Sequence, residues 1–141
     1  MIAIKDTFYS RMFALAGLWN VCIGLTGLVF ADFSVALFFG RTAVTGDFLG
    51  GLSFRLFMVA IITFGIGYCL VSRDLGLNRG IVSLGLACKM ILFVMFTYYY
   101  FTGRATIMAA LTVAGDLAWS VLFMVFLFRT RDSVKHDIIT G

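Results

Sequence analysis

Two residues of opposite charge, Lys89 and Asp116, stand inside long apolar stretches of this chain. A Lys or an Asp at the centre of a membrane-spanning helix costs roughly 2.5–3.5 kcal/mol on the scale derived from insertion experiments. The two residues can offset this cost by pairing, provided that they lie at the same depth. Ionisable residues inside a membrane also commonly mark ligand, ion or proton sites. Lys89 and Asp116 are therefore the first candidates for chemistry.

The depth of each polar residue follows from its distance along a helix that rises about 1.5 Å per residue. Lys89 lies about nine residues from the inner end of the third apolar stretch, and Asp116 lies about eleven residues from the outer end of the fourth. Because each stretch has slightly more than 20 residues, both positions fall near the middle of the membrane. Asn20 in the first stretch and Thr63 in the second fall at a similar level. We therefore expect one polar level to which all four stretches contribute.

Helical spacing extends this candidate site along the fourth stretch, because residues three, four or seven apart share a face. Thr112, Trp119 and Ser120 share a face with Asp116 in this way. The predicted ligand or proton site therefore comprises Lys89, Asp116, Asn20, Thr63, Thr112, Trp119 and Ser120. Arg55, near the outer end of the second stretch, is a weaker candidate for contact with an anionic headgroup. Extension of its side chain to the membrane surface is the favoured explanation.

Two interpretations of the Lys89–Asp116 pair remain open at this point. In the first, the pair is structural and fixes the register of two helices, since a buried pair supported by further hydrogen bonds from Asn20 is tolerable. In the second, the pair lines a water-accessible cavity that binds an anion, a lipid headgroup, a small amphiphile or a proton. Asp116 would then be the titrating group and Lys89 its counter-charge.

Several other function classes have little support in the sequence. No basic run is interleaved with aromatic residues, so nucleic-acid binding is not expected. Cys22, Cys69 and Cys88 are isolated, and His136 is the only histidine, so neither a thiol-redox site nor a metal site is indicated. The apolar stretches contain no His, Glu or paired Cys to act as a base or nucleophile. We therefore expect no cofactor, and enzyme activity is disfavoured.

The elements that must position these residues are four apolar stretches, at about 8–30, 52–72, 80–101 and 105–128. Each is close to the roughly 20 residues that span a hydrocarbon core as a helix. The composition agrees, with 62% hydrophobic and only 13% charged residues among 141. Backbone polar groups inside lipid must be satisfied within the segment, so stretches of this length predict helices. The predicted fold is all-α, an integral membrane four-helix bundle in a single domain, 1–141.

The orientation in the membrane follows from the basic residues near the ends of the stretches. One set of ends carries Lys5, Arg11, Arg73, Arg79, Arg129, Arg131 and Lys135, and the other carries Arg41, Arg55 and Arg104. The positive-inside rule places the richer set in the cytoplasm, together with both termini. Short connections at 73–79 and 102–104 predict neighbouring antiparallel helices. We therefore expect up-down topology in the inner (plasma) membrane, with the longer loop 31–51 outside.

Small residues mark a surface for close helix packing on the first stretch. Its predicted inner face consists of Ala16, Gly17, Asn20, Gly24 and Gly27. Membrane helix interfaces favour small residues beside polar ones, because these let backbones approach closely. In the outer loop, the apolar patch 35–39 predicts either a short helix at the membrane surface or a partial cap on the bundle.

The sequence also resembles a pattern found in small, uncharacterised four-helix membrane proteins of bacteria. The resemblance covers about half of the chain and rests on Gly65-Ile66-Gly67-Tyr68, Ser72-Arg73-Asp74, Asn78-Arg79-Gly80, Lys89, Gly115-Asp116-Leu117 and Phe123. In length and hydropathy the layout is similar to the DoxX-like group, some members of which are linked to quinone-coupled sulfur oxidation. The resemblance implies a fold and a compartment, and it adds a quinone to the candidate amphiphiles.

Two functional hypotheses follow. The first is a protein that binds or transports a small amphiphile, an anion or a proton at Lys89 and Asp116. The second is a non-catalytic accessory subunit of a larger membrane complex, in which exposed aromatic and alanine faces dock a partner or a second copy.

Overall fold

The computed structural model describes residues 6–40 and 46–130, which are helical throughout apart from short turns and contain no strand. The helices are α1 (Thr7–Val29), α2 (Ala31–Phe39), α4 (Phe48–Arg73), α5 (Arg79–Phe101) and α6 (Ile107–Arg129). All but α2 are long and apolar enough to cross a membrane. The prediction of an all-α chain with four candidate spans is therefore confirmed.

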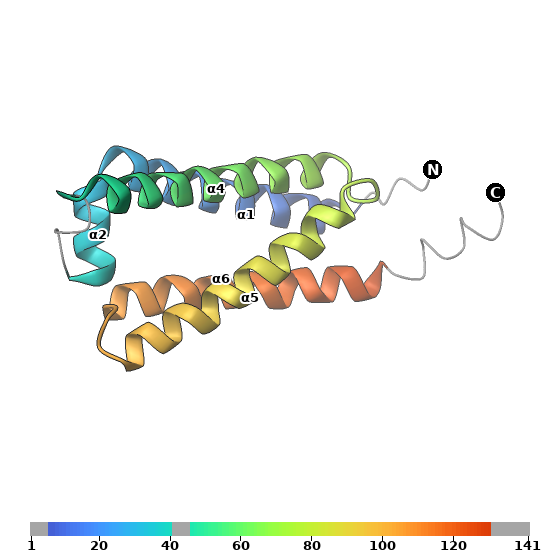
Figure 1. The fold of residues 1–141 in the computed structure, drawn as a ribbon. Helices are drawn as coiled ribbons and strands as arrows, with labels where there is room; N and C mark the ends of the chain where they lie inside the picture. The colour runs from blue at the N-terminus through green and yellow to red at the C-terminus, as the bar shows by residue number, and fades with distance from the viewer. Residues whose placement is uncertain (1–5, 41–45, 131–141) are drawn as a thin grey trace.

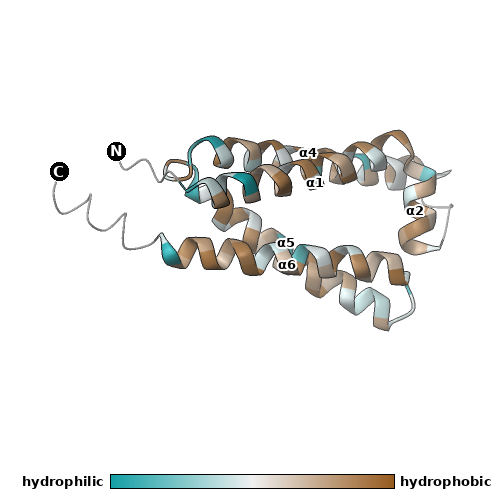
Figure 2. Cartoon of the chain, turned by 180° about the vertical axis from the view of Figure 1, so that it is seen from behind, coloured by the Kyte–Doolittle hydropathy of each residue, from teal (hydrophilic) through white to brown (hydrophobic). Residues whose placement is uncertain are grey.

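The outer surface of the helices is apolar, as Figure 2 shows by the brown colour along all four long helices. Large hydrophobic side chains are exposed on every one of them, such as Leu18 on α1, Leu56 on α4, Val94 on α5 and Leu111 on α6. A surface of this kind is unsuited to water but matches lipid chains. The chain therefore fits a multi-pass membrane protein.

Side-chain caps account for where three helices begin. The carboxylate of Asp6 accepts hydrogen bonds from the first turn of α1, and that of Asp47 accepts one from Gly50 N at 3.0 Å. The Thr106 hydroxyl accepts from Ala109 N in α6. Such caps satisfy backbone donors that lack an intrahelical partner. Because Asp47 is the cap, α4 begins at Phe48, four residues earlier than the predicted start at 52.

The predicted outer loop 31–51 is therefore wrong in extent. Ala31–Phe39 is a helix, and Phe48–Gly51 is the first turn of α4. The apolar patch at 35–39 lies within α2, whose residues Ala31 and Val35 are buried against Phe54 and Met58 of α4. The patch thus forms part of a short helix that partly caps the bundle, and its position at the membrane surface stays a prediction. Gly40 ends α2 with a φ of 64°, a conformation that glycine adopts without strain.

The four long helices form two pairs, α1 with α4 and α5 with α6 (Figure 1). In the first pair the backbones touch, because a Cβ atom placed on Gly17 would lie 2.8 Å from the Gly65 carbonyl oxygen. Gly24 faces Met58 and Ile62 just as closely. The predicted small-residue face of the first helix is thus buried against α4. Only residues without a side chain allow this approach.

The two pairs meet at the end of the molecule where α1 begins and α6 ends. An aromatic core fills the space there and consists of Tyr9, Met12, Phe13, Ala16, Tyr68, Val71, Leu75, Val82, Phe123 and Phe126. Arg79, the first residue of α5, donates to the Thr130 hydroxyl and to the Leu127 carbonyl oxygen at 3.0 Å. These bonds tie the start of α5 to the last turn of α6 and satisfy an otherwise free carbonyl.

At the opposite end the pairs diverge, and α2 spans the distance between them (Figure 1). Thr106 N donates to the Phe38 carbonyl oxygen at 2.8 Å, and the Thr106 hydroxyl donates to that of Leu37. These bonds attach the C-terminal half of α2 to the start of α6, while its N-terminal half packs on α4. The bundle is consequently full at one end and held open at the other.

Some of the charged residues used to predict the orientation lie outside the described residues. They are Lys5, Arg41, Arg131 and Lys135, and His136 lies outside them as well.

Candidate functional site

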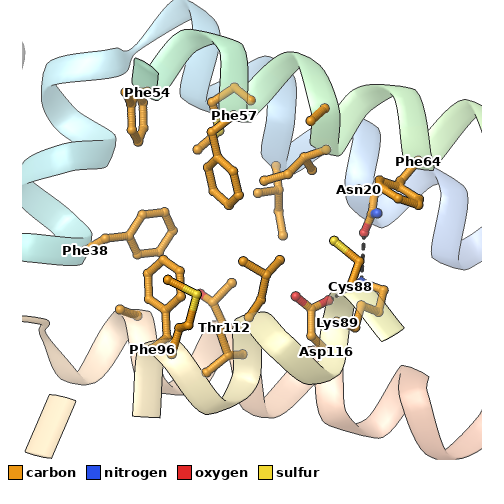
Figure 3. A pocket seen from close by; sticks show the side chains of 18 of the residues that line it. Asn20, Phe38, Phe54, Phe57, Phe64, Cys88, Lys89, Phe96, Thr112 and Asp116 are labelled. Carbon is orange, nitrogen blue, oxygen red and sulfur yellow. Dashed lines mark hydrogen bonds and ion pairs between the residues drawn. The ribbon is translucent and has the colours of Figure 1, made fainter. Parts of the chain in front are cut away.

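Lys89 and Asp116 form an ion pair between α5 and α6. The Lys89 ammonium donates to Asp116 Oδ1 and also to Asn20 Oδ1, at 3.3 Å, from α1. Lys89 and Asn20 are buried, and the Asp116 side chain is 16% exposed. The three polar residues that the sequence placed at one depth on three helices are thus brought together (Figure 3). The contact joins the α1–α4 pair to the α5–α6 pair.

The aromatic core lies directly beneath this pair. The Lys89 nitrogen is 5.9 Å from the centroid of the Tyr68 ring, and that ring lies 4.9 Å from the ring of Phe123. Phe13 packs against Phe123 at 5.0 Å. Each of these three residues is at most 1% exposed. On this side the pair therefore faces packed hydrocarbon, with a favourable cation–π contact from Tyr68.

On its other side the pair faces a cavity of about 410 Å³ between the two helix pairs. This volume falls within the roughly 300–1,000 Å³ typical of small-molecule sites. The walls are mainly aromatic and aliphatic, and the aromatic ones are Phe38, Phe39, Phe54, Phe57, Phe64, Tyr68, Phe96 and Tyr99. In Figure 3, Phe38, Phe54, Phe57 and Phe96 surround the space, and Asn20, Lys89 and Asp116 stand together at one end of it. The cavity is apolar with a single polar end.

The cavity reaches the outer surface between α4 and α5. Ala60 of α4 and Met95 of α5 both line it and are also exposed. The two helices touch mainly near their shared turn, where Tyr68 lies against Gly85. Since α5 crosses away from α4 beyond that contact (Figure 1), the opening faces sideways, toward the lipid chains.

Of the other predicted site residues, some line the cavity and some lie away from it. Thr112 lines the cavity, and its hydroxyl donates to the Met108 carbonyl oxygen within its own helix. Ser120 is buried and bonds to the Asp116 carbonyl oxygen, while Trp119 packs against the aromatic core, so neither lines the cavity. Arg55 is exposed near the start of α4, consistent with either role suggested for it.

Thr63 does not join the cluster. Its side chain is exposed on the outer surface of α4, and its hydroxyl donates to the Val59 carbonyl oxygen at 2.9 Å. Depth alone suggested it, but the face of α4 that turns inward at this level carries Phe64 and Ile61. The expectation that all four long helices contribute a polar group is therefore wrong. Three of them do.

Several cavity residues were missed because their role depends on tertiary packing. Phe38, Phe54 and Phe57 resemble ordinary lipid-facing residues in a chain with 16 Phe, whereas Phe96 shares the predicted inward face of its helix with Lys89. A faint signal exists in α4, where Phe54, Phe57, Ile61, Phe64 and Tyr68 recur every three or four residues. This stripe marks one face, yet nothing in the spacing says that the face borders a cavity.

Within the part of the chain that the structure describes, no three His, Cys, Asp or Glu side chains come together as a ligand group. Cys88 lines the cavity, and its thiol is free.

A comparison with protein-family models, with curated proteins and with solved structures finds no match for this chain.

Proposed function

We propose that this protein binds a small amphiphile in the cavity, with the polar group of the ligand at Lys89, Asp116 and Asn20. The observation that carries the proposal is the single polar end of an otherwise apolar cavity of about 410 Å³. Ligand sites commonly have this composition, because apolar walls supply binding energy and a few polar groups fix the orientation. The opening between α4 and α5 gives such a molecule a route from the bilayer.

An amphiphile suits the cavity better than the other predicted ligands. A small inorganic anion would have to exchange its hydration for walls made of phenylalanine and leucine, at a high desolvation cost. Proton transport needs a path on both sides of the titrating group. The rings of Phe13, Tyr68 and Phe123 close the side of the pair that faces the start of α1. Binding is accordingly the proposed activity, and transport is not part of it.

The finer features of the sequence prediction belong to this proposal. They are an antiparallel up-down topology, cytoplasmic termini, a location in the inner membrane and a DoxX-like layout. The distribution of basic residues supports the orientation, because Arg11, Arg73, Arg79 and Arg129 all lie at the same ends of the long helices. In this orientation α2 lies on the outer side, and the opening between α4 and α5 lies toward that leaflet.

The test is the identity of small molecules that leave the membrane with the protein. Protein purified in lipid nanodiscs is denatured, and the released molecules are compared by mass spectrometry between wild type and the double variant Lys89→Met/Asp116→Asn. We expect one amphiphile class to be enriched with wild type and lost with the double variant, which removes both charges together.

The matched control is Thr63→Ala, which changes a polar side chain at the same depth on the surface that faces away from the cavity. It should retain the amphiphile at the wild-type level. Equal lipid profiles for wild type and the double variant would contradict the proposal, and so would loss of the amphiphile from Thr63→Ala.

A further inference from the structure

The polar end of the cavity carries no net charge. Among the residues that line the cavity, Lys89 and Asp116 are the only ones charged at neutral pH, and they are paired with each other. The two charges cancel, so the pair is neutral overall. A charged headgroup entering the cavity would therefore have no uncompensated opposite charge to meet. It would also lose its hydration among apolar walls, which is expensive for an ion without a partner.

Two polar atoms at this end remain free to bind a ligand. The Asn20 amide oxygen accepts a hydrogen bond from Lys89, and the amide nitrogen makes no hydrogen bond to the residues described. Asp116 pairs through Oδ1, and its second oxygen, Oδ2, likewise has no partner there. Every fully buried side-chain nitrogen or oxygen in the described chain is hydrogen-bonded, so these two atoms keep some accessible surface. Both residues line the cavity, which is the open space beside them.

The two free atoms have opposite hydrogen-bonding roles. The Asn20 nitrogen is a donor, and Asp116 Oδ2 is an acceptor. A hydroxyl group satisfies both at once, because it accepts through a lone pair and donates through its proton. A carboxylate would bring acceptors against the Asp116 oxygen, and an ammonium would bring donors against Lys89 and the Asn20 amide. A ketone, an ether or the carbonyl of a quinone accepts from Asn20 but leaves Asp116 without a donor.

We propose that the ligand is an uncharged amphiphile with a hydroxyl headgroup, such as a long-chain alcohol or a hydroquinone. The hydroxyl accepts from Asn20 and donates to Asp116, while the apolar body occupies the phenylalanine-lined part of the cavity. This inference rests on the proposed function and specifies its ligand class. An unmatched charge costs far more than 1.4 kcal/mol, the equivalent of a tenfold change in affinity, so charged analogues should bind more than about tenfold more weakly.

The experiment uses four single-chain probes with alkyl tails of nine or ten carbons and different headgroups: decanol, decanoate, decylamine and decyl methyl ether. Each is titrated against wild-type protein in nanodiscs of zwitterionic lipid, and the midpoint of thermal unfolding is recorded. Ligands that bind only the native state raise this midpoint with concentration. The same titration with Leu92→Trp, which places a larger ring in the cavity, measures and removes the general effect of each probe on the bilayer.

The expected order in wild type is decanol first, then the ether, and last the two charged probes. The ether lacks one hydrogen bond, so its affinity should fall about threefold to tenfold below that of decanol. Equal stabilisation by all four probes that disappears in Leu92→Trp would overturn the hydroxyl assignment and leave the proposed function standing. A first place for decanoate, decylamine or the ether would overturn it as well. If no probe acts differently on wild type and Leu92→Trp, both proposals fall.

Charge variants sharpen the same test. Asp116→Asn leaves the site with the positive charge of Lys89, so decanoate should move to first place. Lys89→Met leaves the negative charge of Asp116, so decylamine should move to first place. An unchanged order in a folded charge variant would contradict the argument from net charge. If a variant does not fold, the wild-type series alone decides, since it needs no substitution at the pair.

Discussion

The two ends of this bundle use the same residue type for opposite purposes. At the end where α1 begins, Phe13, Phe123 and Phe126 are fully buried and pack ring against ring. At the end covered by α2, phenylalanines such as Phe57 and Phe96 stand only half-buried around a cavity. The Lys89–Asp116 pair lies at the boundary. The comparison shows that the phenylalanines at the α2 end surround a cavity without filling it, whereas those at the other end pack together.

The largest effect is expected where the aromatic core is cut. Phe123→Ala removes a ring that contacts both Phe13 and Tyr68, and such truncations in well-packed interiors cost about 3–5 kcal/mol. Phe57→Ala, at the cavity wall, should cost clearly less than Phe123→Ala, because that ring is only half-buried and borders open space on one side. Reversible unfolding in mixed micelles measures both. Equal losses at the two positions would mean that the two ends are packed alike.

The second-largest loss of stability is expected at the Lys89–Asp116 pair. Lys89→Met strands the Asp116 carboxylate in an apolar setting and should lower the free energy of unfolding by about 3 kcal/mol, since breaking one half of a buried pair leaves the other uncompensated. Lys89→Met/Asp116→Leu should recover most of that loss. The same unfolding assay gives both values. A double variant as unstable as the single would show that the pair itself, and not the lone charge, dominates stability.

The close contact between α1 and α4 leaves no room for an added side chain. Gly17→Ala pushes a methyl group against the Gly65 carbonyl oxygen and the Cys69 backbone, and overpacking of this kind costs about 1–3 kcal/mol. Gly115→Ala in α6 is the matched control, because its added carbon would meet only a Trp19 ring carbon at 3.7 Å, an ordinary contact. Unfolding should show Gly115→Ala to be neutral or slightly stabilising. A comparable loss in both variants would contradict the assignment of the close contact.

A smaller effect is expected at the bridge between α2 and α6. Thr106→Val removes the hydroxyl that caps α6 and donates to the Leu37 carbonyl oxygen, and loss of such a cap costs about 1 kcal/mol. Hydrogen exchange should show faster opening of α2, with the aromatic core unchanged. Unaltered exchange in α2 would mean that the packing of Val35 on α4 holds it in place without the bridge.

The smallest effect is expected at Thr63. Its side chain bonds only within its own helix, so Thr63→Ala should change the free energy of unfolding by less than about 0.5 kcal/mol. A loss above 1 kcal/mol in the unfolding assay would indicate that Thr63 has a partner on the outer surface of α4.

The sequence alone predicts the four long helices and their ends to within one or two residues at most positions. It also predicts the meeting of Lys89, Asp116 and Asn20. These succeed because apolar length and the cost of a buried charge are local properties of the chain. The exposure of Thr63 is not predicted. A count of residues gives the depth of a side chain, but the rotation of a helix about its axis is determined by its packing partners. The cavity cannot be predicted from the sequence for the same reason, because it is formed by the divergence of the two helix pairs.

Under the proposed function, the sideways opening at Ala60 and Met95 determines which ligand concentration governs occupancy of the cavity. A molecule that enters from the lipid is drawn from a pool already concentrated by partitioning, so the relevant quantity is its mole fraction in the leaflet. A site with modest intrinsic affinity can then be nearly full while the same molecule is scarcely detectable in the surrounding water. Occupancy would track the composition of the membrane and would be insensitive to what is dissolved outside it.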